Sequence, residues 1–319
     1  MEANKMSKNP ITKILGIKYP LIQAPLNWLT DAKFVAAVSN AGGLGTFGPN
    51  AGKTSPEQDS MKTLTEEIKR AQQLTDKPFA VNLMVSSSDD FIYPNQVFET
   101  ALAAGVRTFV LSGFLNTELI KKVKKSGSKL IVREMNSTVS GAKEAEKLGA
   151  DVIVATGYDE GGVIPTTGFG TFTTVPRIVD AVSIPVIAAG GVTDVRGVRA
   201  AFALGAQGVY VGTRLIVTNE NRTAQITKEK IVDSGVNDIL LVAPNQRSIK
   251  NAAADKWAAE FDDGDHETFA ATRKAGGVRP AMLDGKINDG VISFDVGIDN
   301  IHEIKSVWEV VDEMMADFK

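Results

Sequence analysis

The chain of 319 residues contains no cysteine. A chain without thiols forms no disulfide, binds no metal through thiolates, holds no iron–sulfur cluster and offers no cysteine nucleophile. Histidine is almost as scarce, because His266 and His302 are the only two, which is too few to suggest a transition-metal centre. We therefore expect no metal centre.

An excess of one charge and long apolar runs are also missing. Lys and Arg number 35 and Asp and Glu 38, which gives a net charge of −3 with both signs dispersed, so no basic face for nucleic acid is expected. No uncharged apolar run approaches the ~20 residues that span a bilayer. The polar amino terminus lacks the apolar segment of a secretory signal. We expect a cytoplasmic protein that acts on a small molecule, binds neither nucleic acid nor membrane, and is compatible with a homodimer.

The sequence does contain a regular alternation of short apolar runs with helical patterns. Runs rich in β-branched residues suit strands that are covered on both faces, as in a parallel sheet. The expected strands cover residues 21–24, 44–47, 79–85, 108–111, 129–132, 152–155, 185–189 and 208–211, and the helices between them cover 31–39, 56–74, 93–104, 117–125, 141–148, 175–182 and 195–204. An open doubly wound sheet would place its phosphate-binding glycines after the first strand. Here the richest glycine turns follow the last three strands, which favours an α/β fold of the (β/α)8 TIM barrel type.

The chain changes character after strand eight. Charged helical patterns at 219–234, 248–261 and 268–273, with a short strand at 238–242, precede an amphipathic helix at 301–318. We interpret residues 218–298 as a small, mostly helical insertion that forms a substrate or lid domain across the barrel mouth. Residues 1–217 and 299–319 then form the barrel, which the last helix completes.

Two glycine turns follow consecutive strands, Gly190-Gly191 and Gly212-Thr213. Glycine lets backbone approach a ligand closely and leaves N–H groups free to point at an anion, and the following helix N-terminus adds a partial positive charge. One such pair would be explained by the needs of a tight turn. Two in matching positions of a barrel predict a phosphate site.

Two amide side chains interrupt the apolar strands, Gln23 and Asn82. A buried amide must find hydrogen-bond partners. Neighbouring backbone could supply them, and so could a planar heterocycle bound over the barrel mouth.

These residues resemble a known family. The segments P-V-I-A-A-G-G-V and A-F-A-L-G-A-Q-G-V-Y-V-G-T-R, with P-L-I-Q-A-P-L, A-G-G-L-G-T-F-G, V-N-L-M-V and D-G-K-I-N-D-G-V, are similar to the nitronate monooxygenases, formerly called 2-nitropropane dioxygenases. The FMN-dependent enoyl-acyl-carrier-protein reductases of the second type share that fold and motif. The resemblance implies FMN in the barrel mouth, bound by Ala24, Pro25, Asn82, Gly161, Gly162, Gly190, Gly191, Gly212 and Thr213.

One position departs from the family. Its strand-six motif ends in Gly-Gly-His, and that histidine acts as the base for the nitro substrate, whereas Val163 stands in its place here. Valine cannot transfer a proton. Tyr158, Asp159 and Glu160 are the titratable residues of the same loop; Asp159 and Tyr158 are weak candidates, each with a structural alternative, and His266 reaches the site only if the insertion folds over the mouth.

The departure from the family at Val163 makes hydride transfer from NADH or NADPH to an electron-poor acceptor, an enoyl thioester or a quinone, the better prediction. Nitronate oxidation with a different base, a non-catalytic flavin-binding protein and a phosphosugar-type barrel enzyme are the alternatives.

Overall fold

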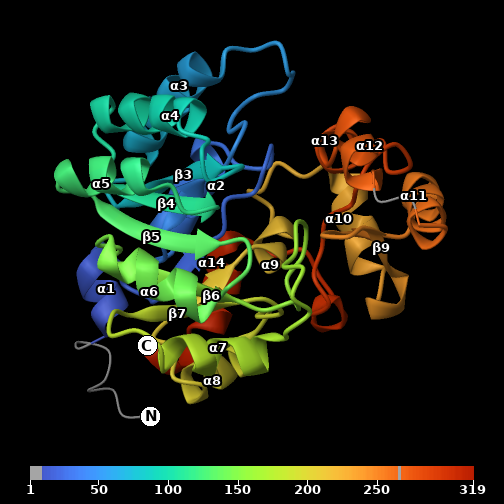
Figure 1. Ribbon diagram of the computed structural model, residues 1–319. Coiled ribbons are helices and arrows are strands. Elements are labelled where there is room, and N and C mark those ends of the chain that lie inside the picture. Colours follow the sequence, from blue (N-terminus) through green and yellow to red (C-terminus); the bar gives the residue numbers. More distant parts are fainter. Residues whose placement is uncertain (1–8, 265–266) are drawn as a thin grey trace.

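Eight parallel strands form the centre of the molecule in the computed structural model, which describes residues 9–264 and 267–319 (Figure 1). They are β1 (Leu21–Gln23), β2 (Gly45–Phe47), β3 (Phe79–Val85), β4 (Thr108–Gly113), β5 (Lys129–Glu134), β6 (Val152–Thr156), β7 (Val186–Ala189) and β8 (Val209–Val211), in the order β1-β8-β7-β6-β5-β4-β3-β2. The two edge strands also meet, because the Gln23 N–H donates to the Leu44 carbonyl and the Leu44 N–H to the Leu21 carbonyl, each at 2.9 Å. The sheet is therefore closed, and the predicted barrel is confirmed.

Helices cover the outside of the barrel in the expected alternation. They are α2 (Ala32–Asn40), α3 (Ser60–Leu74), α4 (Ile92–Ala103), α5 (Thr117–Lys125), α6 (Val139–Lys147), α7 (Thr171–Val179) and α8 (Val195–Ala203), and α14 (Val307–Met314) is the eighth. Side-chain caps fix several starts: Asp31, Asp59, Asn116 and Asp194 each accept an N–H from the first turn of the helix that follows. The cap at Asp59 explains why α3 begins at Ser60 and not at residue 56 as predicted.

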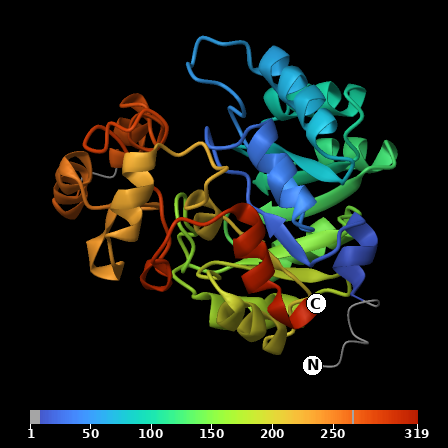
Figure 2. The same ribbon diagram turned by 180° about the vertical axis from the view of Figure 1, so that it is seen from behind.

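The helix α14 packs between α8 and α2 and so closes the ring of helices (Figure 2). Its Val307, Val310, Val311 and Met314 are buried in the core between strands and helices. The helix is shorter than the predicted 301–318, because the hydroxyl of Ser306 caps it and a capping box with Glu309 sets its first turn.

A short helix that was not predicted, α1 (Pro10–Leu15), lies at the end of the barrel where the strands begin. Ile11 and Leu15 join the apolar cluster inside the barrel. Nearby, the Asn9 side chain donates to the Gln207 carbonyl at 2.9 Å. Gln207 precedes β8, so α1 covers the amino-terminal ends of the strands and leaves the carboxyl ends for a site.

Between β8 and α14 the chain forms a second group of elements, which Figures 1 and 2 show on one side of the barrel. They are α10 (Gln225–Val232), η2 (Val236–Asp238), β9 (Ile239–Ala243), β10 (Gln246–Ile249), α11 (Ala252–Asp262), α12 (Thr268–Lys274), α13 (Arg279–Met282) and η3 (Ile298–Asn300). The short α9 (Thr213–Ile216), which precedes them, lies against the barrel and contacts α14 (Figure 1). β9 and β10 form an antiparallel hairpin. The prediction of one helix over 248–261 was wrong at its start, because Ser248 and Ile249 pair with β9 and Asn251 caps α11.

In the described parts of the chain, no helix combines the length and the apolarity that crossing a membrane requires.

Candidate functional site

The interior of the barrel changes from apolar to polar towards the carboxyl ends of the strands. Inward-facing Ala80, Val110, Ile131 and Val154 belong to one buried apolar cluster. Because side chains alternate along a strand, the residues two positions further on face the same interior. These are Asn82 on β3, Ser112 on β4, Arg133 on β5 and Thr156 on β6. Together with Tyr210 on β8, they form a polar layer at the end where barrel enzymes have their active sites.

Asn82 has a free acceptor in this layer. Its amide nitrogen donates to the Val110 carbonyl at 2.9 Å and to the Ser112 hydroxyl at 2.8 Å. Its Oδ1 is buried and has no hydrogen-bond partner among the described residues, and the same holds for Thr46 Oγ1, Thr156 Oγ1 and the Tyr210 hydroxyl. Buried polar atoms without partners are costly, so this cluster indicates a ligand that supplies them.

Gln23 differs from Asn82, because both ends of its amide are bound within the protein. Its Oε1 accepts the Thr46 N–H at 2.7 Å, and its Nε2 donates to the Ala24 carbonyl. The structural interpretation of Gln23 therefore accounts for its contacts.

The turn after β7, at Gly190 and Gly191, has a backbone suited to an anion cradle. Gly190 and Gly191 have φ of 104° and 70°, in the region that favours glycine. Their N–H groups donate to no other group in residues 9–264 and 267–319. A Cβ on Gly190 would lie 2.7 Å from Thr171 Oγ1 and 3.0 Å from the Gly157 carbonyl oxygen, so any side chain there meets its surroundings. The cradle fits a phosphate group.

The hydroxyl of the neighbouring Thr213 already has a hydrogen-bond partner within the protein. This hydroxyl donates to the carboxylate of Asp295, a buried residue that no pattern in the sequence indicated. Burial raises the pKa of Asp295 to about 6, although the Thr213 hydroxyl and the Gly297 N–H stabilise its charged form. The helix α9 that begins at Thr213 has only four residues, so it adds little of the partial charge expected of a helix N-terminus at this position.

The loop after β6 packs against the second group of elements. Val163 pairs with Gln246 of β10, and the Ile164 N–H donates to the Asn245 carbonyl at 2.8 Å. The loop thus extends the β9–β10 hairpin. Gly161 and Gly162 are needed here, because a Cβ would lie 2.3 Å from the Phe294 carbonyl carbon and 2.7 Å from Ser293 Oγ.

The weak candidates Asp159 and Tyr158 have structural partners. The Asp159 carboxylate accepts the N–H of Thr171, the first residue of α7. The Tyr158 ring lies under the guanidinium of Arg247 at 4.3 Å, and its carbonyl accepts a hydrogen bond from the same group. His266 lies outside the described residues.

Glu160 is the titratable group of this loop with the most perturbed environment. It forms an ion pair with Arg133, and its side chain is 16% exposed. Burial raises its pKa to about 7 against the opposing effect of Arg133. Burial also raises the pKa of Tyr210 beyond its usual range. Arg133 lies one residue past the predicted end of its strand; continuing the alternation from Ile131 would have placed it inside the barrel.

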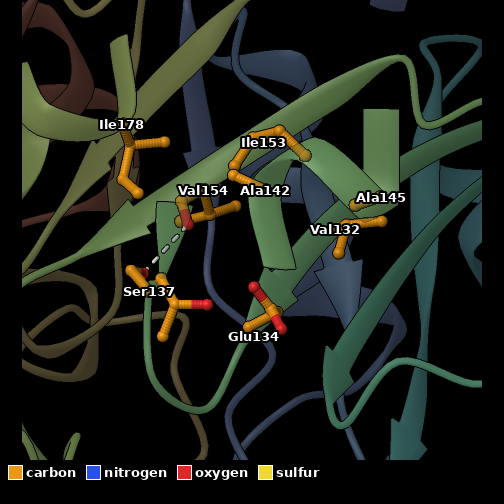
Figure 3. A pocket seen from close by; sticks show the side chains of 9 residues that line it. Val132, Glu134, Ser137, Ala142, Ala145, Ile153, Val154 and Ile178 are labelled. Atoms are coloured by element: carbon orange, nitrogen blue, oxygen red, sulfur yellow. Dashed lines mark hydrogen bonds between the residues drawn. The ribbon is translucent and has the colours of Figure 1, made fainter. Parts of the chain in front are cut away.

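A separate small cavity lies outside the barrel, between β5, α6, β6 and α7 (Figure 3). Its lining is mostly apolar, and Glu134 points into it beside Ser137 and Ala142. Burial raises the pKa of Glu134 to about 7. Within the described residues, no group of three or more His, Asp or Glu side chains is arranged to hold a metal ion.

Comparisons with known proteins agree with this geometry. The family model described as nitronate monooxygenase matches residues 8–317. A probable nitronate monooxygenase of Staphylococcus haemolyticus (strain JCSC1435) is 34% identical, with 73% of this chain and 74% of that protein covered. FabK from Thermotoga maritima superposes with a TM-score of 0.85 at 29% identity, covering 97% of this chain and 96% of that one. A nitroalkane oxidase from Streptomyces ansochromogenes, at 22% identity and a TM-score of 0.74 over 97% of both chains, shares the fold.

Proposed function

The chain belongs to the nitronate monooxygenase family, whose members are FMN-dependent oxidoreductases, and on this premise we propose that it binds FMN in the barrel mouth and reduces an electron-poor acceptor with electrons from NADH or NADPH. An enoyl thioester or a quinone is the expected acceptor. The single observation that carries the choice of reaction is Val163, which leaves the family's proton-transfer position without a titratable group.

The described residues fit the cofactor. The unpaired Oδ1 of Asn82 offers an acceptor to the N–H edge of the flavin ring, and Ala24 and Pro25 would lie beside it. Gly190, Gly191, Gly212 and Thr213 would hold the phosphate, with Gly161 and Gly162 close to the ring. FMN, when bound, supplies the transfer of one or two electrons. The protein's part is to orient the acceptor and exclude water.

We also propose that residues 218–298 form a substrate domain on a barrel made of residues 1–217 and 299–319. Support comes from the contacts of β10 with the loop after β6, since that loop lies at the carboxyl end of the barrel. A domain held at this end can close over a substrate.

Spectroscopy tests the proposal directly. The purified protein should be yellow with an FMN-like spectrum, and NADH or NADPH should bleach that colour under anaerobic conditions. The nucleotide that reduces the flavin faster identifies the preferred electron donor. A colourless protein that takes up no added FMN would overturn the cofactor assignment. A yellow protein that neither donor bleaches would leave a binding protein without this catalytic activity.

The environment of Glu160 supports a second candidate function, the oxidation of a nitronate with a different base. A carboxyl with a pKa of about 7 beside the glycine turn is suited to proton transfer near neutral pH. Turnover of an alkyl nitronate that is lost in Glu160→Gln would support this candidate, and negligible turnover in the unaltered protein would exclude it.

A further inference from the structure

The buried carboxylate of Asp295 lies at the proposed phosphate cradle. It accepts hydrogen bonds from the Thr213 hydroxyl and, at 2.8 Å, from the Gly297 N–H. Gly297 in turn approaches Gly191, because a Cβ on Gly297 would lie 3.3 Å from the Gly191 carbonyl oxygen. Asp295 is only 5% exposed, so water screens its charge weakly. A phosphate group at the cradle would therefore meet a carboxylate that already holds Thr213.

The surroundings of Asp295 do not neutralise a further negative charge. Asp159 lies close by, with its Cβ 3.3 Å from where a Cβ on Gly191 would stand. The carboxylate of Glu160 also interacts electrostatically with Asp295, and Arg133 forms its ion pair with Glu160. Arg247 faces the same region, but its guanidinium donates to the carbonyls of Tyr158 and Glu160.

Before any phosphate binds, the described residues of this region therefore contribute three carboxylates and only two guanidinium groups. The carboxylates belong to Asp295, Asp159 and Glu160, and the guanidinium groups to Arg133 and Arg247. A phosphate monoester carries about −1.5 to −2 charge at pH 7. The free N–H groups of Gly190 and Gly191 attract that anion, whereas an ionised Asp295 repels it. A neutral Asp295 removes the repulsion, and its carboxyl O–H can donate to a phosphate oxygen.

We propose that Asp295 takes up a proton when the flavin phosphate binds, so that it makes recognition of the phosphate dependent on pH. The inference rests on the proposed FMN site. The step is a proton transfer from solvent that converts the carboxylate to the neutral acid, and no covalent bond to the phosphate forms or breaks.

The structure sets the size of the effect. The pKa of Asp295 without ligand is raised to about 6 by burial. If the bound state needs the neutral acid, FMN affinity falls about tenfold per pH unit above that value, which gives a loss of about 50-fold from pH 6 to pH 8. The phosphate's own second pKa of about 6 would act in the opposite direction if its dianion were preferred.

The experiment compares dissociation constants of FMN and riboflavin between pH 6 and pH 8, by quenching of flavin fluorescence, in the cofactor-free full chain. Asp295→Asn should bind FMN more tightly than the unaltered protein at pH 8 and should lose most of the pH dependence. Riboflavin, which has no phosphate, should bind with little pH dependence. Asp317→Asn, which alters an exposed carboxylate paired with Arg199, is the matched control and should behave like the unaltered protein.

Calorimetry on the unaltered protein keeps the test independent of the folding of the variant. In two buffers of different ionisation enthalpy at pH 7.5, FMN binding should take up about one proton and riboflavin binding none. FMN affinity that is constant or rises with pH, without proton uptake, would overturn the role of Asp295 and leave the FMN site standing. Failure of both flavins to bind would instead overturn the proposed function.

Discussion

Gly190 lies where a side chain would obstruct the proposed phosphate cradle, so Gly190→Ala gives a quantitative test. Its φ of 104° is strained for any L-residue, at a cost of about 1–2 kcal/mol. The new Cβ would lie 2.7 Å from Thr171 Oγ1, which itself donates to the Gly190 carbonyl at 2.9 Å and so cannot move freely. Relieving that contact should cost about 1–3 kcal/mol more. We expect the free energy of unfolding to fall by about 2–5 kcal/mol.

Gly127 provides the matched control. It lies in the turn between α5 and β5 with a φ of 77°, and a Cβ there would have nothing within 4 Å. Gly127→Ala therefore carries the backbone cost alone, about 1 kcal/mol. It should leave FMN binding unchanged, because the turn lies at the amino-terminal end of β5.

The assay has two measurements on each variant, urea unfolding without cofactor and FMN binding by fluorescence quenching. Gly190→Ala should lose more stability than Gly127→Ala and should bind FMN at least about tenfold more weakly, equivalent to about 1.4 kcal/mol. Equal stability losses would contradict the close contact at Gly190. Unchanged FMN affinity in Gly190→Ala would contradict the cradle as the phosphate site, whatever its effect on stability.

Three further experiments test other parts of the site and fold. Val163→His should raise turnover of an alkyl nitronate by about 10²-fold in steady-state assays if the family's base position is intact; no gain in a variant that still binds FMN would contradict that alignment. Arg133→Met should lower the free energy of unfolding by about 3 kcal/mol at pH 8, since it leaves the Glu160 carboxylate buried without its partner, and adding Glu160→Gln should restore most of that loss. Glu134→Gln should raise the free energy of unfolding by about 1 kcal/mol at pH 8 and change it little at pH 5. The reason is that burial raises the pKa of Glu134 to about 7, so the folded state loses stability as pH rises towards that value. A larger gain in stability at pH 5 than at pH 8 would contradict this pH dependence.

Much of the barrel could be predicted from local pattern. The bounds of α5 and β3 agree with the prediction, because each has a strong local signal. Asn116 caps α5, whose Leu119, Ile120 and Val123 form one buried face, and β3 is an apolar run that only Asn82 interrupts. Elements with weak local signals were missed or misplaced. The helix α1 has six residues, and β10 needs its partner β9 to be recognised as a strand.

The candidate site divides in a similar way. The glycines after β7 and the polar Asn82 are visible in the sequence, since each breaks an apolar pattern at a strand or its end. Asp295 and Arg133 are not, because their importance depends on which groups surround them. Asp295 meets Thr213 across 82 positions of sequence, and no periodicity indicates such a contact.

The sequence by itself determined the alternation of strands and helices and the likeness to the nitronate monooxygenase family, because these are properties of residue type and local order. That Val163 stands at the family's base position is still a prediction from the sequence. Only the tertiary structure decided which buried polar atoms lack partners and which charges lie together. Burial and proximity set the protonation of Glu160 and Asp295, and both arise from the packing of segments that are distant in the chain.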